Sequence, residues 1–344
     1  IVGGISVFIS GQSMTGEAEE GLVDATQLGS EKIDIIVKNR LLVLQEIANR
    51  PDIQSMNFKI QQDSLKGDVE RLGYLDMAIV TPTGQATYVS SGDEADLSDR
   101  SYIQKSLAGE VNVSDVLISK VTNSAVLMYA VPITKNGRVI GALIGRRDGN
   151  ALSEITDGMG FGDEGYAYII NDKGITVAHP NREFVMTQFQ PIEAAKTDNT
   201  LEPVATAFAD ILKNKEGVGS YTYKGNDLYY GYHTIEGTNW TLVNTAFKSE
   251  VLGGVSRLFI SLLRIIAVVV VIASIVAFFL ARSIATPIVA LTQIVNRQAA
   301  LDFTKNDSKD YSKIEKRKDE IGSMTTALFS MSENVRELLI NVSS

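Results

Sequence analysis

Residues 124–147 read SAVLMYAVPITKNGRVIGALIGRR, the clearest strand pattern in the chain. Two runs rich in aliphatic and β-branched residues flank Lys135, Asn136 and Gly137. Asn-Gly between such runs is the strongest short-range signal of a β-hairpin. The stretch therefore predicts two antiparallel strands joined by a tight turn.

The same design recurs along the chain. Residues 75–90 read LDMAIVTPTGQATYVS, residues 165–180 read GYAYIINDKGITVAHP, and residues 217–235 read GVGSYTYKGNDLYYGYHTI. Each stretch places turn residues between two runs that favour strands. The run NWTLVNTAF at 239–247 predicts a final strand.

A long helix is predicted ahead of these strands, over residues 25–50. Its apolar residues recur with helical spacing, and Pro51 and Asp52 follow it directly. The order of elements predicts an α+β domain: one long helix and two stacked sheet modules, the first over about 74–150 and the second over about 160–247.

A different kind of segment follows, from Leu258 to Leu280, reading LFISLLRIIAVVVVIASIVAFFL with Arg264 as its single charge. A helix of this length covers roughly 34 Å, enough to cross a bilayer. A helix buried in a soluble core is the other interpretation, but no polar face is visible. We predict a transmembrane helix.

Charge is distributed unevenly about this segment. The whole chain has a formal net charge of −9; the residues up to Leu280 carry −10 and those after it carry +1. Arg282 directly after the apolar segment favours a cytoplasmic C-terminal side, which leaves the acidic region at 15–255 outside the cytoplasm. The apolar start IVGGISVFIS predicts that residues 1–14 are the remnant of a first transmembrane helix, with a buried strand as the alternative. We expect the chain to continue beyond NVSS, and thus to be cut at both ends.

Composition excludes several classes of function. The chain has no cysteine and only two histidines, His179 and His233, which excludes thiolate metal sites and cysteine nucleophiles and argues against a catalytic histidine cluster. The acidic balance argues against nucleic-acid binding. We predict a non-catalytic protein without a cofactor or metal, with His179, His233 and Trp240 in structural roles.

The region 30–247 resembles the double Cache sensor domain of bacterial receptors. The resemblance rests on Asp96-Leu-Ser-Asp-Arg-Ser-Tyr102, on Ser106-Leu-Ala-Gly109, on Ala130-Val-Pro-Ile133 with Gly141-Ala-Leu-Ile144, and on residues 165–181. It implies that the first, membrane-distal module holds a small ligand behind its sheet.

In the amino-acid-binding subgroup, the resemblance assigns ligand-binding roles to Arg100, Tyr102 and Asp148. An Arg there grips a carboxylate in bidentate fashion, and the Asp receives the ammonium group. We add Ser119 and Tyr129 as candidate ligand-binding residues. The sequence departs from the subgroup at Ala95, Ile103, Ile118 and Lys120, and it has Tyr102 where the subgroup has Trp.

Because of these departures the ligand stays open: an amino acid, an amine, a nucleobase, another carboxylate, or none. Each residue also has a structural interpretation. Arg100 can pair with Asp96 or Asp99, Asp148 can serve a turn before a helix, and Tyr129 can belong to the core.

After the apolar segment, two helical patterns carry coiled-coil spacing. The first runs through Ile284, Ile288, Leu291, Val295 and Gln298, and the second through Ile321, Met324, Leu328, Met331, Val335 and Leu338. A polar, nonhelical connector is predicted between them, over about 300–318. With Pro287 and Asp319-Glu-Ile-Gly322, residues 281–335 resemble the HAMP signalling module, which forms a four-helix bundle as a dimer; residues 336–344 resemble the start of a chemoreceptor's signalling helix.

Together these features predict a dimeric, multi-pass membrane chemoreceptor of the methyl-accepting chemotaxis type. Its expected partners are a small extracellular ligand, membrane lipid, a second copy of the chain, and a chemotaxis histidine kinase with its coupling protein. The alternatives are a sensor histidine kinase or a diguanylate cyclase whose catalytic domain lies beyond this sequence, and an adhesion ectodomain. The sequence leaves the ligand and the sign of the response undetermined.

Overall fold

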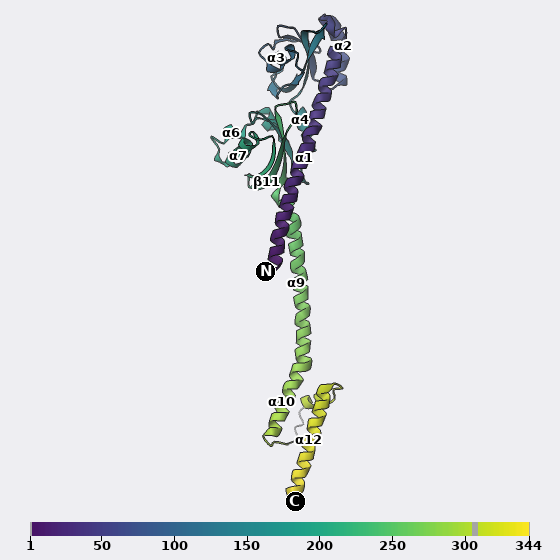
Figure 1. Ribbon diagram of the computed structural model, residues 1–344, viewed down its shortest axis with the longest axis vertical. Helices are drawn as coiled ribbons and strands as arrows, with labels where there is room; N and C mark the ends of the chain where they lie inside the picture. The colour runs from purple at the N-terminus through teal and green to yellow at the C-terminus, as the bar shows by residue number, and fades with distance from the viewer. Residues whose placement is uncertain (1, 305–308, 344) are drawn as a thin grey trace. The chain divides into compact units, whose positions relative to one another are not determined.

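The computed structural model describes residues 2–304 and 309–343. It divides into two compact units, Ile1–Ser256 and Arg257–Ser344, and each is described by itself. The first unit contains two antiparallel sheets and a long helix, α1, that runs beside both of them (Figure 1). It is therefore an α+β unit, as the strand patterns predict.

The helices and strands of the first unit are bounded as follows. In chain order they are α1 (Val2–Ala48), α2 (Phe58–Arg71), β1 (Asp76–Val80), β2 (Gln85–Tyr88), β3 (Glu94–Asp96), α3 (Ser101–Leu107), β4 (Asn112–Val113), β5 (Leu117–Ile118), β6 (Ala125–Lys135), β7 (Arg138–Asp148), α4 (Ala151–Thr156), β8 (Ala167–Asn171), β9 (Thr176–Ala178), α5 (Arg182–Met186), α6 (Pro191–Ala194), α7 (Glu202–Ile211), β10 (Glu216–Tyr223), β11 (Asn226–Thr234), β12 (Trp240–Phe247) and α8 (Lys248–Val251), with short 3-10 turns at Ile53–Ser55 and Asn199–Leu201.

The predicted hairpins are confirmed. β6 and β7 pair from Val126–Asp148 to Lys135–Arg138, and the turn residues Asn136 and Gly137 have φ of 51° and 75°. Both values are positive, as a type I′ hairpin turn requires. Lys224 and Gly225 repeat this geometry between β10 and β11.

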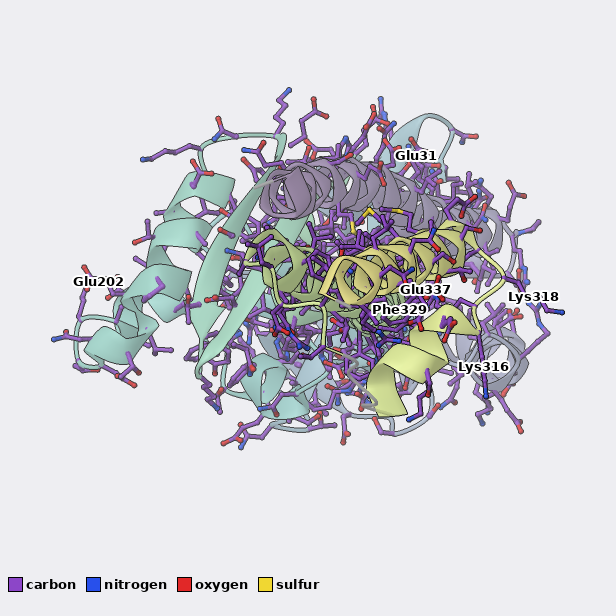
Figure 2. The ribbon with its side chains drawn as sticks, turned by 90° about the horizontal axis from the view of Figure 1, so that it is seen from below. Glu31, Glu202, Lys316, Lys318, Phe329 and Glu337 are labelled. Atoms are coloured by element: carbon purple, nitrogen blue, oxygen red, sulfur yellow. The ribbon has the colours of Figure 1, made fainter. Side chains whose placement is uncertain are left out.

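Each sheet has one face on α1 and another covered by shorter helices. The first sheet has the strand order β3-β2-β1-β7-β6-β4, with β5 also paired to β6; the second has the order β10-β11-β12-β8-β9. One continuous core joins α1 to both sheets, through residues such as Ile33 and Leu44 of the helix, Leu127 of the first sheet and Leu242 of the second. Figure 2, which labels Glu31 on α1 and Glu202 at the start of α7, shows the second sheet between these two helices.

α1 begins earlier than predicted. The sequence places its start near residue 25, whereas the structure continues the helix from Val2. Gly16 and Gly21 interrupt the apolar pattern, but Leu22 is fully buried against Tyr229 and Ala246 of the second sheet. This packing stabilises turns that helix propensity alone disfavours. The alternative of a strand at the N-terminus is wrong, because residues 2–14 are helical.

The second unit is helical. It comprises α9 (Gly253–Leu280) from Arg257 onward, a π-helical stretch (Ala281–Ala285), α10 (Thr286–Ala299), α11 (Lys309–Glu315) and α12 (Glu320–Ser343). Among the described residues, one helical stretch, Phe259–Ala299, is long and apolar enough to cross a membrane, with a mean hydropathy of 2.9 in its most apolar window. The connector differs from the prediction, since it contains α11.

Within this unit α10 and α12 contact each other. Leu291 and Ile294 of α10 are buried, and the Gln298 side-chain amide donates a hydrogen bond to the Ser332 hydroxyl of α12. Figure 2 shows Lys316 and Lys318 on the segment that leads into α12. Asp319, directly before α12, accepts hydrogen bonds from Arg317 and from the Gly322 backbone. These bonds lower the pKa of Asp319 to about 2, and the bond from Arg317 has the larger effect.

Candidate functional site

The face of the first sheet turned away from α1 forms a mixed apolar and polar layer. Strand alternation puts Val126, Met128 and Ala130 of β6 on this face, and cross-strand pairing adds residues 142, 144, 146 and 148 of β7. α3 covers the layer with Tyr102 and Ile103. This is the layer that the Cache resemblance designates for a ligand.

Arg146 is the most unusual residue of this layer. The residue is 6% exposed, yet neither its Nε nor its Nη1 has a hydrogen-bond partner among the described residues. Its Nη2 lies 3.9 Å from the Asp76 carboxylate, and its guanidinium lies 4.8 Å from the centre of the Tyr88 ring. A buried charge with unpaired donors is costly, so its retention calls for an explanation.

Asp76 is the counter-ion of Arg146 but lies beyond hydrogen-bond distance of it, and its carboxylate is hydrogen-bonded to backbone amides instead. Its Oδ1 accepts from the amides of Met77 and Ser90 at 2.8 and 2.9 Å, and its Oδ2 accepts from that of Ser91 at 3.3 Å. These hydrogen bonds hold the turn after β2 against β1. The Arg146 donors stay available for another acceptor.

Arg100 lies at the N-terminal end of α3. Its Nη2 donates to the Ile118 carbonyl at 3.2 Å, whereas its Nε is buried without a partner in the described part of the chain. Lys120 binds Asp99 at 2.6 Å, and this hydrogen bond lowers the pKa of Asp99. The alternative pairing of Arg100 with Asp96 or Asp99 is not among the ion pairs of the described residues.

Asp148 and Arg100 approach the same corner of the sheet. Asp148 pairs with Val126 at the end of β7, and Ile118, whose carbonyl binds Arg100, pairs with the neighbouring Ala125. The Asp148 carboxylate is exposed and accepts a hydrogen bond from the Asn150 backbone at 2.8 Å. A cation and an anion thus flank one corner, which suits a zwitterion.

Tyr102 and Ser119 lie nearby in different roles. Tyr102 is buried in the layer itself, and this burial raises the pKa of its hydroxyl, which stays protonated at neutral pH. The Ser119 hydroxyl oxygen accepts from the backbone amides of Val121 and Thr122, both at 3.2 Å, and so holds a turn.

Tyr129 does not join these residues. It is 1% exposed and belongs to the core on the α1 face, where its ring meets that of Tyr74 edge to face at 6.2 Å. Successive side chains of a strand point to opposite faces, so Tyr129 points away from the layer that holds its neighbour Met128. The structure therefore separates Tyr129 from the other four predicted residues.

Sequence reasoning missed Arg146 and Tyr88. Both face the layer, and Tyr88 lies over the Arg146 guanidinium; burial raises the pKa of Tyr88, although the nearby Arg146 opposes this shift. A signal was present: Arg146 is in phase with Ala142 and Ile144, the buried positions of β7. A charge in the phase of core residues indicates a buried cation.

A separate aromatic cavity lies on the outer face of the second sheet. It is a small, half-open depression lined mainly by aromatic side chains, including Tyr168, His179, Phe184 and Phe208. Stacked and tilted contacts join these rings and that of Phe189 at centroid distances from 4.5 to 5.8 Å. The rings pack on one another as a small core.

His179 gives this region a pH dependence. Burial lowers its pKa from 6.5 to about 4, and its Nδ1 accepts a hydrogen bond from the Asn181 backbone. Because the unfolded chain binds the proton at higher pH than the folded one, stability is greatest above pH 6.5 and is lost as the pH falls toward 4, by at most about 3 kcal/mol.

Replacing His179 by Asn keeps a hydrogen-bond acceptor but removes the titrating group, so the variant should lose this dependence of stability on pH. Urea unfolding at pH 7 and pH 5, followed by Trp240 fluorescence, measures it; an equal pH dependence in both proteins contradicts the prediction.

Asp115 connects the edge of the first sheet to the second sheet. It lies between β4 and β5, where the Ser114 hydroxyl donates to its carbonyl. Its carboxylate accepts from Trp240 Nε1 at 2.8 Å, from Asn171 Nδ2 at 3.1 Å and from Asn239 Nδ2 at 3.2 Å. The segment between β4 and β5 therefore has a direct polar contact, through Asp115, with β8 and with the start of β12.

No group of three or more His, Cys, Asp or Glu side chains within the described ranges is arranged to hold a metal ion. The polar groups of the layer instead offer hydrogen bonds and charge.

Comparison with known proteins identifies the family that this chain resembles. Residues 10–255 match the family model described as the Cache domain. The chain is 25% identical to the methyl-accepting chemotaxis protein McpA of Bacillus subtilis over 243 residues, which cover 70% of this chain and 33% of that protein. It is 22% identical to McpC of the same organism over 350 aligned positions, covering 96% of this chain and 48% of that protein. It thus spans between a third and a half of these relatives.

Solved structures agree on the fold. The ligand-binding domain of the Pseudomonas fluorescens chemoreceptor CtaA, in complex with L-isoleucine, superposes with a TM-score of 0.57 at 16% identity, covering 72% of this chain and 99% of that one. The sensory domain of the Campylobacter jejuni chemoreceptor Tlp3, with isoleucine bound, gives 0.54 at 14% identity and covers 71% and 98%. The predicted resemblance to bacterial chemoreceptors is confirmed, and the chain belongs to the Cache domain family.

Proposed function

We propose that this chain is the sensing and membrane-spanning part of a chemoreceptor that binds a small carboxylate-bearing ligand, an α-amino acid, in the outer layer of its first sheet. The observation that carries the proposal is the group of buried arginine donors without partners in this layer, Nε of Arg100 and Nε and Nη1 of Arg146; a further such donor, Nε of Arg147, lies on the α1 side of the sheet. A carboxylate provides acceptors for guanidinium donors in the geometry they prefer.

The two ends of an amino acid match the corner of the layer. Arg100 receives the carboxylate, and Asp148 receives the ammonium group. The related structures of CtaA and Tlp3 carry L-isoleucine, L-leucine, L-serine or L-valine, which supports this class of ligand. Tyr102 provides an apolar wall, and Ser119 holds the turn beside Arg100.

We further propose the arrangement that the sequence predicts for the rest of the chain. The domain of residues 15–255 is a double Cache with a distal module (about 74–150) and a proximal module (about 160–247), outside the cytoplasm. Residues 258–280 cross the membrane, residues 1–14 end a first crossing, residues 281–335 form a HAMP module, and residues 336–344 begin the cytoplasmic signalling helix.

A second copy of the chain completes the HAMP module in this proposal. Several apolar residues at the predicted coiled-coil positions are exposed in the single chain. Ile284, Ile288 and Val295 of the first helix are 45–48% exposed, and Met324 and Met331 of the second helix are 59% and 47% exposed. Apolar side chains at coiled-coil spacing bury themselves by packing against a partner helix. Ligand binding outside shifts this dimer between two packings and so controls a histidine kinase through a coupling protein.

The alternative of a sensor histidine kinase or diguanylate cyclase is not favoured. The curated relatives are methyl-accepting chemotaxis proteins, and the relative covered best, McpC, aligns across the apolar segment and the helices that follow. We retain the non-catalytic chemoreceptor as the conclusion.

Isothermal titration of the full chain in detergent with the twenty common L-amino acids, one at a time, tests the binding function. We expect saturable binding of a subset, each with one site per chain. Acetylated and amidated derivatives of a binding amino acid, which lack one charged end, should bind at least tenfold more weakly. Absence of binding by every amino acid would contradict the proposal.

A further inference from the structure

We infer that Arg146 is a second anion-binding residue and that the site prefers ligands with two acidic groups, namely acidic α-amino acids or short dicarboxylic acids. The inference rests on the proposed function and extends it. It comes from the hydrogen-bond partners of each charged group in the layer.

The layer leaves hydrogen-bond donors, rather than charge, unsatisfied. Lys120 is paired with Asp99 at 2.6 Å, and Asp76, the counter-ion of Arg146 at 3.9 Å, accepts its hydrogen bonds from three backbone amides. When an amino acid binds, its carboxylate occupies Arg100 and its ammonium group occupies Asp148. Arg146 then still lacks an acceptor for two of its nitrogen atoms.

A neutral ligand does not resolve this deficit. The nearest anion, Asp76, is 3.9 Å from Nη2, beyond ordinary hydrogen-bond length. The cation–π contact with Tyr88 stabilises the charge from one side, but it provides no acceptor for Nε or Nη1. A carboxylate provides two acceptor oxygens in the plane of the guanidinium.

The position of Arg146 fits a group on the ligand's side chain. Arg146 and Asp148 are two residues apart on β7 and face the same side, so their Cα atoms are about 7 Å apart. Tyr88 and Tyr102 lie in the same buried layer, and the charge of Arg100 acts on both of their hydroxyls. Arg146 and Asp148 therefore lie on one face of β7, and the charge of Arg100 reaches the same layer.

The sequence departures of the site agree with this preference. Where the amino-acid-binding subgroup has a Tyr and an Asp, this chain has Ile118 and Lys120. Replacing an anion by a cation at the rim makes the approach to the site more favourable for an acidic ligand. Lys120 is itself paired with Asp99, so the preference comes from Arg146.

Matched ligand pairs test the inference on the full chain in detergent. Isothermal titration compares L-aspartate with L-asparagine and L-glutamate with L-glutamine, since each pair differs mainly in the charge of one group; succinate is the dicarboxylate probe. We expect at least one acid to bind ten times or more tightly than its amide. Equal affinities for acid and amide would overturn the inference and leave the proposed function intact, whereas no binding by any amino acid or by succinate would overturn both.

Substitutions separate a ligand-binding role from a structural one. Arg146→Met should weaken binding of the acid by 10-fold to 100-fold and change binding of the amide less than threefold, because the lost donors serve the second carboxylate. Arg147→Met is the matched control: it removes the same charge from the next residue of β7, on the α1 face, and should leave both affinities unchanged. If Arg146→Met does not fold, as judged by Trp240 fluorescence, Arg146→Lys keeps the charge and should still lower the acid-to-amide ratio severalfold. An equal loss for acid and amide would mean that Arg146 only supports the fold, and would overturn the inference.

Discussion

Replacing Asp115 by alanine is expected to lower the free energy of unfolding by about 3 kcal/mol, because three donors lose a charged acceptor at once. The donors are Nε1 of Trp240 and the side-chain amides of Asn171 and Asn239, at 2.8 to 3.2 Å. Trp240 is 1% exposed, so water does not readily replace the lost partner. Urea unfolding followed by the fluorescence of this single tryptophan measures the change.

A control for this experiment is Asp63→Ala. Asp63 is a largely exposed carboxylate on α2 whose ion pair with Lys59 spans 3.5 Å. A pair of this kind contributes about 0.5 kcal/mol or less. If Asp115→Ala proves as mild as Asp63→Ala, Asp115 does not join the two sheets in the way the hydrogen bonds indicate.

Replacing Arg100 by alanine is expected to weaken ligand binding by about 100-fold, because a bidentate, charge-assisted contact with the carboxylate is lost. Arg100→Lys keeps the charge but not the planar pair of donors, so a loss of about tenfold is expected. Isothermal titration of the full chain with the amino acid that binds most tightly to the unmodified protein gives both values.

The matched control is Arg138→Ala, at the exposed start of β7 and at the opposite end of that strand from Asp148. It removes a positive charge from the same sheet and should leave the dissociation constant unchanged within twofold, apart from weak long-range attraction. An Arg100→Ala protein that binds as tightly as Arg138→Ala would remove Arg100 from the site.

The prediction of structure from sequence succeeded where local rules decide. Asn136-Gly137 and Lys224-Gly225 adopt the positive φ values that a tight hairpin demands, so the strands on either side were predictable. It failed where long-range packing decides. Residues 15–24 carry an interrupted apolar pattern, yet they are helical because Leu22 packs on the second sheet.

The site shows the same division at the level of single residues. Arg100, Tyr102 and Asp148 were predicted from a resemblance in sequence and Ser119 was added to them, and the structure places Arg100 and Asp148 at one corner of the sheet, with Tyr102 and Ser119 nearby. Arg146 and Tyr88 emerged only from burial and unpaired donors. Neither property can be calculated without knowing which elements cover the strand.

By itself, the sequence determined the α+β order of elements, the hairpins, the apolar helix and the acidic character of the region before it. It also determined that Met128 and Tyr129 point to opposite faces, because strand alternation is a local property. Only the tertiary structure decided which face receives α1 and which receives α3. That choice depends on contacts between distant segments, and it put Tyr129 in the core and Arg146 in the layer proposed to bind the ligand.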